Sequence, residues 1–258
     1  LGRFRVNVSI ARGSFVIVIR AIPFEIPSIE ELKLPQVLKD ISKHQNGIIL
    51  VTGATGSGKS TTVASMLDHI NQNFTKNIIS FEEPIEYLHR DKKCIINQKE
   101  IPDDVKDYTT ALKYVLRQDP DIIFLGELRD QQTIEAAIKA SETGHLVIST
   151  LHTISATKTI TRILDFFPPE RSKSLRYQLS ENIRAVVSQR LLKTVDNSKR
   201  VVCEVLLNTG TVQELLVTEE GMRRIPEILK KSEQLGMQSF DTEILKLYRS
   251  GLIDFETA

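Results

Sequence analysis

The chain has 258 residues, 41% of them hydrophobic and 26% charged, a composition that excludes collagen-like, low-complexity and fully disordered proteins. Its 34 lysines and arginines nearly balance its 33 aspartates and glutamates, so the net charge of +1 gives no overall signal for nucleic acid or an anionic membrane. No apolar run approaches the roughly 18 residues that indicate a membrane span. Two cysteines, Cys94 and Cys203, make no disulfide framework and fit a reducing compartment.

The first residues predict a β-hairpin followed by a linker. Residues 3–8 alternate polar and apolar side chains, residues 15–19 are a run of strand-forming residues, and a turn at 11–14 separates the two. Two prolines then mark residues 23–28 as a linker or hinge. Because the sequence opens inside the alternating segment, we expect the domain that contains this hairpin to begin before Leu1.

After a helical segment interrupted at Pro35, the chain alternates between short apolar runs and longer amphipathic segments. We expect strands at 48–51, 78–81, 122–125, 146–149 and 201–207. Helices are expected at 59–72, 107–118, 130–142, 155–166 and 170–192, and, in a charged region after about residue 209, at 222–235 and 240–250. The pattern predicts an α/β fold with a mainly parallel sheet buried beneath helices.

The segment GATGSGKS at 53–60 fits the pattern of a phosphate-binding loop at every position. Its glycines allow backbone N–H groups to approach phosphate oxygens, and the helix that follows points its positive end at the anion. Lys59 is expected to reach the β- and γ-phosphates, and Ser60 to offer its hydroxyl to Mg²⁺. The expected nucleotide-binding residues are Gly53, Ala54, Thr55, Gly56, Ser57, Gly58, Lys59, Ser60 and Thr61.

Two acidic groups follow predicted strands, where a hydrolytic site needs support for a metal ion and for water. Glu127 comes after the run at 122–125, separated from it by one glycine. Glu82 follows the run at 78–81, and Glu83 and Glu86 make that region strongly anionic. We therefore take Glu82 and Glu127, with Lys59, as candidate catalytic residues, and Ser60 and Glu127 as candidate magnesium ligands.

Two histidines, His145 and His152, flank the strand predicted at 146–149. A neutral histidine near a γ-phosphate could sense it by hydrogen bonding, whereas the alternative is a structural polar residue. A zinc site is not expected, because Cys94 and Cys203 lack close cysteine or histidine partners in the sequence.

Four motifs in order, GATGSGKST at 53–61, SFEEPIEYLH at 80–89, DPDIIFLGELRD at 119–130 and TGHLVISTLHT at 143–153, resemble those of the type II/IV secretion superfamily of hexameric ATPases. They correspond to its Walker A motif, Asp box, Walker B motif and His box. Flanking segments, RFRVNV at 3–8 and GMQSFDTEILKLYRSGLI at 236–253, extend the resemblance over essentially the whole chain.

Within this superfamily the chain looks like the type IV pilus retraction ATPases, the PilT type. KKCIINQKEI at 92–101 is similar to that type, and the four-cysteine zinc module common in assembly and secretion motors is absent from the sequence. Two positions depart from the type: Glu83 stands where the Asp box usually has aspartate, and VQELLVTEE at 212–220 replaces an AIRAE-like segment. Pilus assembly and type II secretion therefore stay open as alternatives.

The resemblance implies a RecA-like ATPase core over 29–258, preceded at 1–22 by the end of a PAS-like N-terminal domain. It implies that Glu82 orients the attacking water, that Glu127 lies near Mg²⁺, and that His145 and His152 sense the γ-phosphate or link subunits. Basic residues are implied to reach phosphates, some from a neighbouring subunit; the candidates are Arg3, Arg5, Arg12, Arg20 and Arg117, with Lys113 where related motors have arginine.

For the assembly, the resemblance implies a homohexamer that binds ATP or ADP with Mg²⁺ and works in the cytoplasm on an inner-membrane pilus platform protein. It implies no nucleic acid partner. Two other hypotheses remain open: a nucleotide-gated module with negligible turnover, and a nucleic-acid motor. The near-neutral charge and the lack of a stripe of basic and aromatic residues argue against the latter.

Overall fold

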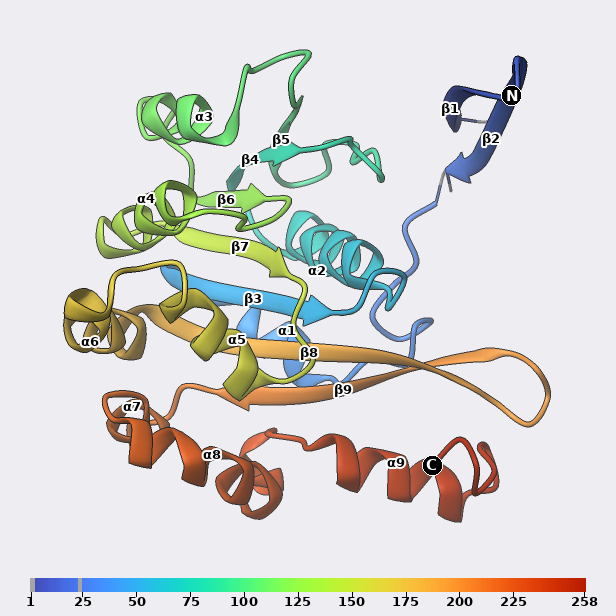
Figure 1. Cartoon of the computed structure of the whole chain (residues 1–258). Helices are drawn as coiled ribbons and strands as arrows, with labels where there is room; N and C mark the ends of the chain where they lie inside the picture. Colours follow the sequence, from blue (N-terminus) through green and yellow to red (C-terminus); the bar gives the residue numbers. More distant parts are fainter. Residues whose placement is uncertain (1–2, 23–24) are drawn as a thin grey trace.

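A seven-stranded sheet forms the centre of the molecule in the computed structural model, which describes residues 3–22 and 25–258 (Figure 1). The strand order is β5–β4–β6–β7–β3–β8–β9, with six parallel strands and β9 antiparallel to β8. The strands are β3 (Gly47–Gly53), β4 (Asn77–Glu82), β5 (Ile95–Glu100), β6 (Ile122–Leu125), β7 (Leu146–Leu151), β8 (Ile183–Lys193) and β9 (Lys199–Leu207). The predicted α/β fold with a mainly parallel sheet is confirmed.

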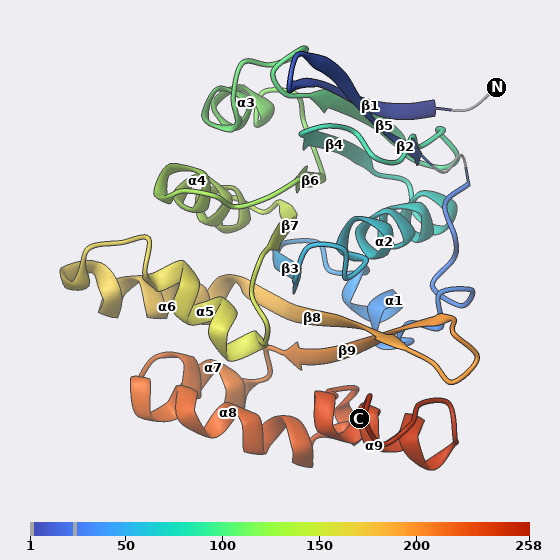
Figure 2. The same cartoon turned by 45° about the vertical axis from the view of Figure 1, so that its right-hand side comes forward.

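Helices cover both faces of this sheet, as Figure 2 shows. One face carries α1 (Val37–Ile41) and α2 (Lys59–Asn73). The other carries α3 (Tyr108–Val115), α4 (Gln131–Glu142), α5 (Ala156–Leu164) and α6 (Ser172–Asn182). Three further helices lie along β9: α7 (Gly210–Leu216), α8 (Glu219–Lys231) and α9 (Phe240–Arg249). Among the helices of the described residues, none combines the length and the apolar character that crossing a membrane requires.

Strand β3 explains why the apolar runs of the sequence are unbroken. All seven of its residues are buried. Ile48 and Leu50 belong to the core under α3–α6, whereas Ile49 and Val51 belong to the core under α1 and α2. Because successive side chains on a strand point to opposite faces, a strand covered on both sides needs apolar residues at every position.

A separate β-hairpin, β1 (Arg3–Ala11) and β2 (Ser14–Ile22), precedes the sheet and stands apart from it (Figure 1). Arg12 and Gly13 turn the chain with φ values of 53° and 77°, as a two-residue hairpin loop requires. The predicted hairpin is thus confirmed. Arg5 joins it to the rest of the molecule through an ion pair with Glu86, at 3.2 Å. The predicted linker over 23–28 includes residues 23 and 24, which lie outside the described residues, and it stays a prediction.

The largest error of the sequence analysis concerns the helix expected over 170–192. Helix α6 ends at Asn182, and the chain continues as strand β8. The spacing of Ile183, Val186 and Val187 fits a helix, but these β-branched residues suit a strand equally well, and β8 is paired on both sides, with β3 and β9. Pairing across the sheet therefore overrides the local periodicity.

Smaller differences occur where tertiary contacts decide the structure. Strand β5 and helix α7 have no counterpart among the elements predicted from the sequence. Strand β5, IINQKE, is an edge strand in which no residue is buried, so its apolar signal is weak. The single helix expected at 222–235 divides into α8 and a short 3-10 helix, Glu233–Leu235.

The junction between α6 and β8 depends on Asn208, whose Nδ2 donates to the carbonyl oxygens of Ser180 at 2.6 Å and Ile183 at 2.8 Å. We predict that Asn208→Ala lowers the free energy of unfolding by about 1–3 kcal/mol, because it leaves two carbonyl groups without their donor. Urea denaturation would measure this loss. Asn73→Ala is the matched control, since Asn73 also donates to a helix carbonyl but is exposed; an equal loss in both variants would contradict the prediction.

Candidate nucleotide site

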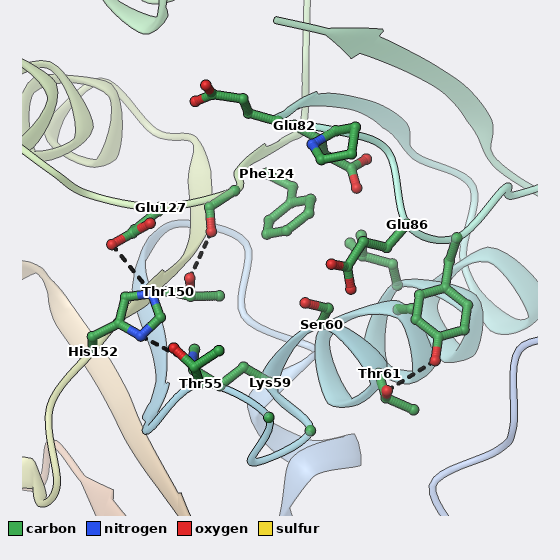
Figure 3. Close-up of a pocket in the computed structure, with 18 of the residues that line it drawn as sticks. Thr55, Lys59, Ser60, Thr61, Glu82, Glu86, Phe124, Glu127, Thr150 and His152 are labelled. Carbon is green, nitrogen blue, oxygen red and sulfur yellow. Dashed lines mark hydrogen bonds and ion pairs between the residues drawn. The ribbon is translucent and has the colours of Figure 1, made fainter. Parts of the chain in front are cut away.

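Strands β3, β4, β6 and β7 are parallel, so their carboxyl ends meet at one edge of the sheet, where ligands bind in open α/β sheets. A cleft of about 380 Å³ lies at this edge, large enough for a small ligand. Figure 3 shows Lys59 and Ser60 on one side of it, with Glu82, Glu86 and Glu127 around the opposite side.

The loop between β3 and α2 has the backbone that a phosphate site requires. Gly58 has a φ of 92°, in the left-handed region that glycine adopts readily. A Cβ at Gly53 would lie 2.5 Å from both Gln189 O and Ser57 Oγ, so no side chain fits there. Helix α2 has no side-chain cap and no acidic residue in its first turn. Its first N–H groups are therefore available to an anion.

Lys59 lies over this loop with its ammonium group bound to the backbone. Its Nζ donates to Gly53 O at 2.9 Å and to Ala54 O at 3.0 Å, and lies 3.4 Å from Nδ1 of His152. Burial lowers the pKa of Lys59, and the negative charges of Glu127 and Glu86 oppose that change. The cation is thus held at the loop, next to the space that a phosphate would enter.

Glu127, after β6, belongs to a charged network across the cleft. Arg129 donates from Nε to Glu127 Oε2 at 2.9 Å and from its guanidinium group to Glu83 Oε2 at 2.6 Å. The other oxygen of Glu127 lies 3.4 Å from Nε2 of His152, as the dashed line in Figure 3 marks. Arg129 therefore connects the acidic groups that follow β6 and β4.

Glu82, the last residue of β4, lines the same cleft but is more enclosed. Burial raises the pKa of its carboxyl group, while hydrogen bonds from Ser80 and Gln98 act in the opposite direction. A carboxylate whose pKa is raised, next to a phosphate loop, has the properties of a general base.

The segment after Glu82 is attached both to α2 and to the hairpin. The hydroxyl groups of Tyr87 and Thr61 are hydrogen-bonded at 2.8 Å. Glu86 pairs with Arg5, and Arg20 of β2 lines the cleft itself. The hairpin therefore supplies one arginine to the cleft and another to its rim.

Gly126 stands at the strand end where many nucleotide-binding enzymes place a metal-binding aspartate. A Cβ at this position would lie 2.9 Å from Oη of Tyr108 and 3.3 Å from the carbonyl oxygen of Phe81. Tyr108, on α3, is itself buried enough that its pKa rises to about 12. A side chain at position 126 would therefore have to displace the Tyr108 hydroxyl group, whereas Glu127 lines the cleft without such a shift.

Comparison with known proteins agrees with this geometry. The family model described as "Type II/IV secretion system protein" matches residues 15–250. The chain belongs to this family. It is 42% identical over its full length to both the type IV pilus ATPase PilU and the retraction ATPase PilT of Pseudomonas aeruginosa, spanning 68% and 75% of those proteins. A crystal structure of the pilus retraction motor PilT with bound ADP is similar with a TM-score of 0.93 and 42% identity, covering all of this chain and 73% of that one.

Most of the residues predicted from the family's motifs meet in the cleft. Its lining includes Thr55, Gly56, Gly58, Lys59, Ser60, Thr61, Glu82, Glu127, His152 and Arg20. Ser57 is buried beneath the loop, and its Oγ has no partner among the described residues. Gly53 and Ala54 provide the carbonyl groups that hold Lys59. The side chain of Arg3 lies outside the described residues.

His145 and Arg117 lie outside this cleft. His145 precedes β7, so it stands at the end of the strand opposite His152, where its Nδ1 lies 3.0 Å from Ala140 O. Arg117 is exposed between α3 and β6, at the amino ends of the strands. The structure does not bring either residue to the nucleotide site of its own chain, and their predicted contacts between subunits stay predictions.

The residues of the site that sequence reasoning missed include Arg129, Tyr108 and Tyr87. Arg129 could have been found, because it stands two residues after Glu127 in a short acidic and basic cluster. Tyr87 stands inside the Asp-box segment at 80–89, so that motif could have indicated it. Tyr108 reaches the cleft only because separate elements converge there, and nothing in its local sequence indicates it.

The positions of Ser60 and Glu127, the two candidate ligands, fit a magnesium ion. The hydroxyl group of Ser60 lies in the first turn of α2, and Glu127 lines the same cleft with its carboxylate turned toward His152 (Figure 3). No cluster of three or more histidine, cysteine, aspartate or glutamate side chains in the described part of the chain could enclose a metal. Mg²⁺ takes one or two protein ligands and otherwise binds water and phosphate oxygens, so one hydroxyl group and one carboxylate in the cleft are enough to hold it.

We predict that Lys59→Ala weakens the binding of a non-hydrolysable ATP analogue by at least about 30-fold, because it removes a buried cation that pairs with phosphate. Isothermal titration calorimetry would measure the loss. Lys139→Ala, at an exposed position on α4, is the control and should bind normally. Equal affinities for wild type and Lys59→Ala would contradict this assignment of the cleft.

Proposed function

We propose that this chain is an ATP-hydrolysing motor that drives retraction of type IV pili. The observation that supports hydrolysis is the convergence of a phosphate loop and two acidic strand ends in one cleft. Similarity over the whole chain to proteins named as pilus retraction ATPases supports pilus retraction as the process that this hydrolysis drives.

In this proposal the phosphate loop and Lys59 bind the β- and γ-phosphates of ATP. Phosphate oxygens replace the carbonyl groups of Gly53 and Ala54 as partners of the Lys59 ammonium group. Ser60 and Glu127 would hold Mg²⁺, which would supply positive charge against the β- and γ-phosphates. Arg129 and His152 keep the Glu127 side chain turned into the cleft.

Glu82 acts as the general base. Its carboxylate accepts a proton from a water molecule whose oxygen forms a new bond to the γ-phosphorus. The bond between that phosphorus and the β–γ bridging oxygen breaks, and its electron pair stays on ADP. The products are ADP and inorganic phosphate, with the proton on Glu82 until it is released to solvent.

Positive charge stabilises this transition state from more than one direction. Arg20 already lines the cleft, and Arg5 is held at its rim by Glu86. We assign Arg5 and Arg20, with Arg3, to contacts with the phosphates when the hairpin closes over the cleft, and His152 to sensing the γ-phosphate through its contact with Lys59. Arg117 and His145 face a neighbouring subunit.

The working form in this proposal is a homohexameric ring on the cytoplasmic side of the inner membrane, where it acts on the platform protein of the pilus machinery. ATP stabilises a closed position of the hairpin domain, and product release reopens it. A ligand moves such an equilibrium only through different affinities for the two states, so the arginines that contact phosphate only in the closed state supply the coupling.

We predict that Glu82→Gln and Glu127→Gln each reduce turnover by at least about 100-fold, because they remove the base and a metal ligand while leaving the phosphate loop intact. Phosphate release from Mg-ATP across a protein dilution series would measure this, and in the wild type turnover per chain should rise with concentration as rings form. Glu170→Gln, at an exposed position, should hydrolyse normally. If Glu82→Gln or Glu127→Gln hydrolysed ATP as fast as the wild type, the role assigned to that residue would be contradicted.

The direction of work is tested in cells. Cells that produce only the Glu127→Gln variant should make pili that extend but do not shorten, as observed with fluorescently labelled pili. Cells without any pili would instead identify an assembly motor. Normal retraction would contradict the proposal altogether.

A further inference from the structure

Two neutral side chains behind the cleft donate hydrogen bonds to the same oxygen of Glu82. Ser80 donates from Oγ to Glu82 Oε1 at 2.7 Å, and Gln98 donates from Nε2 to that same atom at 3.0 Å. Ser80 is 1% exposed, so its hydroxyl group has no access to bulk water. Both donors thus act on Oε1 and leave Oε2 to other partners.

The sheet itself brings these groups together. Ser80 and Glu82 are two residues apart on β4, so their side chains share one face of the sheet. Gln98, on the neighbouring parallel strand β5, is in register with Ser80. The three side chains are therefore fixed by strand pairing and not by a loop.

The orientation of the Gln98 amide is fixed by its other partners. Its Oε1 accepts a hydrogen bond from the backbone N–H of His89 at 2.8 Å, and its Nε2 also donates to Tyr87 O at 2.8 Å. A backbone N–H can only donate, so the oxygen of the amide must face His89 and the NH₂ group must face Glu82. Gln98 therefore also holds the segment that follows Glu82 against β5.

We propose that Ser80 and Gln98 are positioning residues for the hydrolysis reaction, which fix Oε1 of Glu82 so that Oε2 is the oxygen that takes the proton from water. This inference rests on the proposed role of Glu82 as the general base. Neither Ser80 nor Gln98 is among the residues that line the cleft, so both act through Glu82 and not on the nucleotide.

The same two hydrogen bonds, together with one from the backbone of Glu86, oppose the effect of burial on the pKa of Glu82. They stabilise the charged form of Glu82 against burial, which raises its pKa. Removing either donor therefore raises that pKa further, and the acid limb of the rate profile moves to higher pH. Glu100 is the register partner of Glu82 on β5. The charged and titratable residues that line the cleft with Glu82 are Glu83, Glu86, His89, Tyr108, Lys59, Glu127, Arg129 and Arg20.

The test is the pH dependence of kcat in Ser80→Ala and Gln98→Met, measured as phosphate release by the full chain at saturating Mg-ATP. We expect the acid limb to move up by about 1–2 pH units in each variant, since a hydrogen bond to a charged group has that effect on a pKa. KM for ATP should stay within about twofold of wild type, because the phosphate loop is unchanged. Ser80→Thr, which keeps a hydroxyl donor, should restore the acid limb.

A buried serine elsewhere in the sheet provides the matched control. Ser149, on β7, is also fully buried, but its Oγ donates to the carbonyl oxygen of Leu125. Ser149→Ala loses a similar buried hydrogen bond, and its acid limb should not move. A shift of equal size in Ser149→Ala would show a general structural effect and would overturn the inference.

Glu82→Gln, assayed alongside, separates the inference from the function on which it rests. If Glu82→Gln stops turnover but the acid limbs of Ser80→Ala and Gln98→Met match wild type, the positioning role is overturned and the base remains. If Glu82→Gln turns over like wild type, the base itself is wrong, and the inference fails with it.

Discussion

Four parallel strands ending at one edge of a single sheet are the constraint on which the rest of this site depends. The phosphate loop, Glu82, Glu127 and His152 follow β3, β4, β6 and β7, and none of these groups is near another in sequence. Parallel strands need crossover helices, and those helices bury both faces of the sheet. The covered sheet is rigid enough to hold charged groups at fixed separations around a small cleft.

Within that cleft, the charged side chains and His152 form a continuous series of contacts. Lys59 lies within 3.4 Å of His152, His152 within 3.4 Å of Glu127, and Arg129 links Glu127 to Glu83. The positive loop and the two acidic strand ends are therefore not independent. Replacing one partner by a phosphate changes the electrostatic environment of all the others, which suits a site that must distinguish ATP from ADP.

Where the signal is local, the sequence predicts which groups meet in the cleft. The phosphate loop is a continuous motif, and Glu82 and Glu127 stand one and two residues after plain apolar runs. Prediction fails where strand pairing decides the secondary structure. The spacing of Ile183, Val186 and Val187 fits a helix, and only the pairing of β8 with β3 and β9 makes this segment a strand. Ser80 and Gln98 carry no signal of their own, because only the register of β4 with β5 brings them to Glu82.

The crowding around Gly126 limits how this site can vary. Tyr108 comes from α3 and Gly126 from the end of β6, yet the hydroxyl group of the first occupies the space that a side chain on the second would need. An aspartate enters at position 126 only if the Tyr108 hydroxyl group moves aside and the backbone near the Phe81 carbonyl oxygen, 3.3 Å from the added Cβ, shifts slightly. The residue that carries the acid at this strand end is therefore coupled to the position of a side chain on another element.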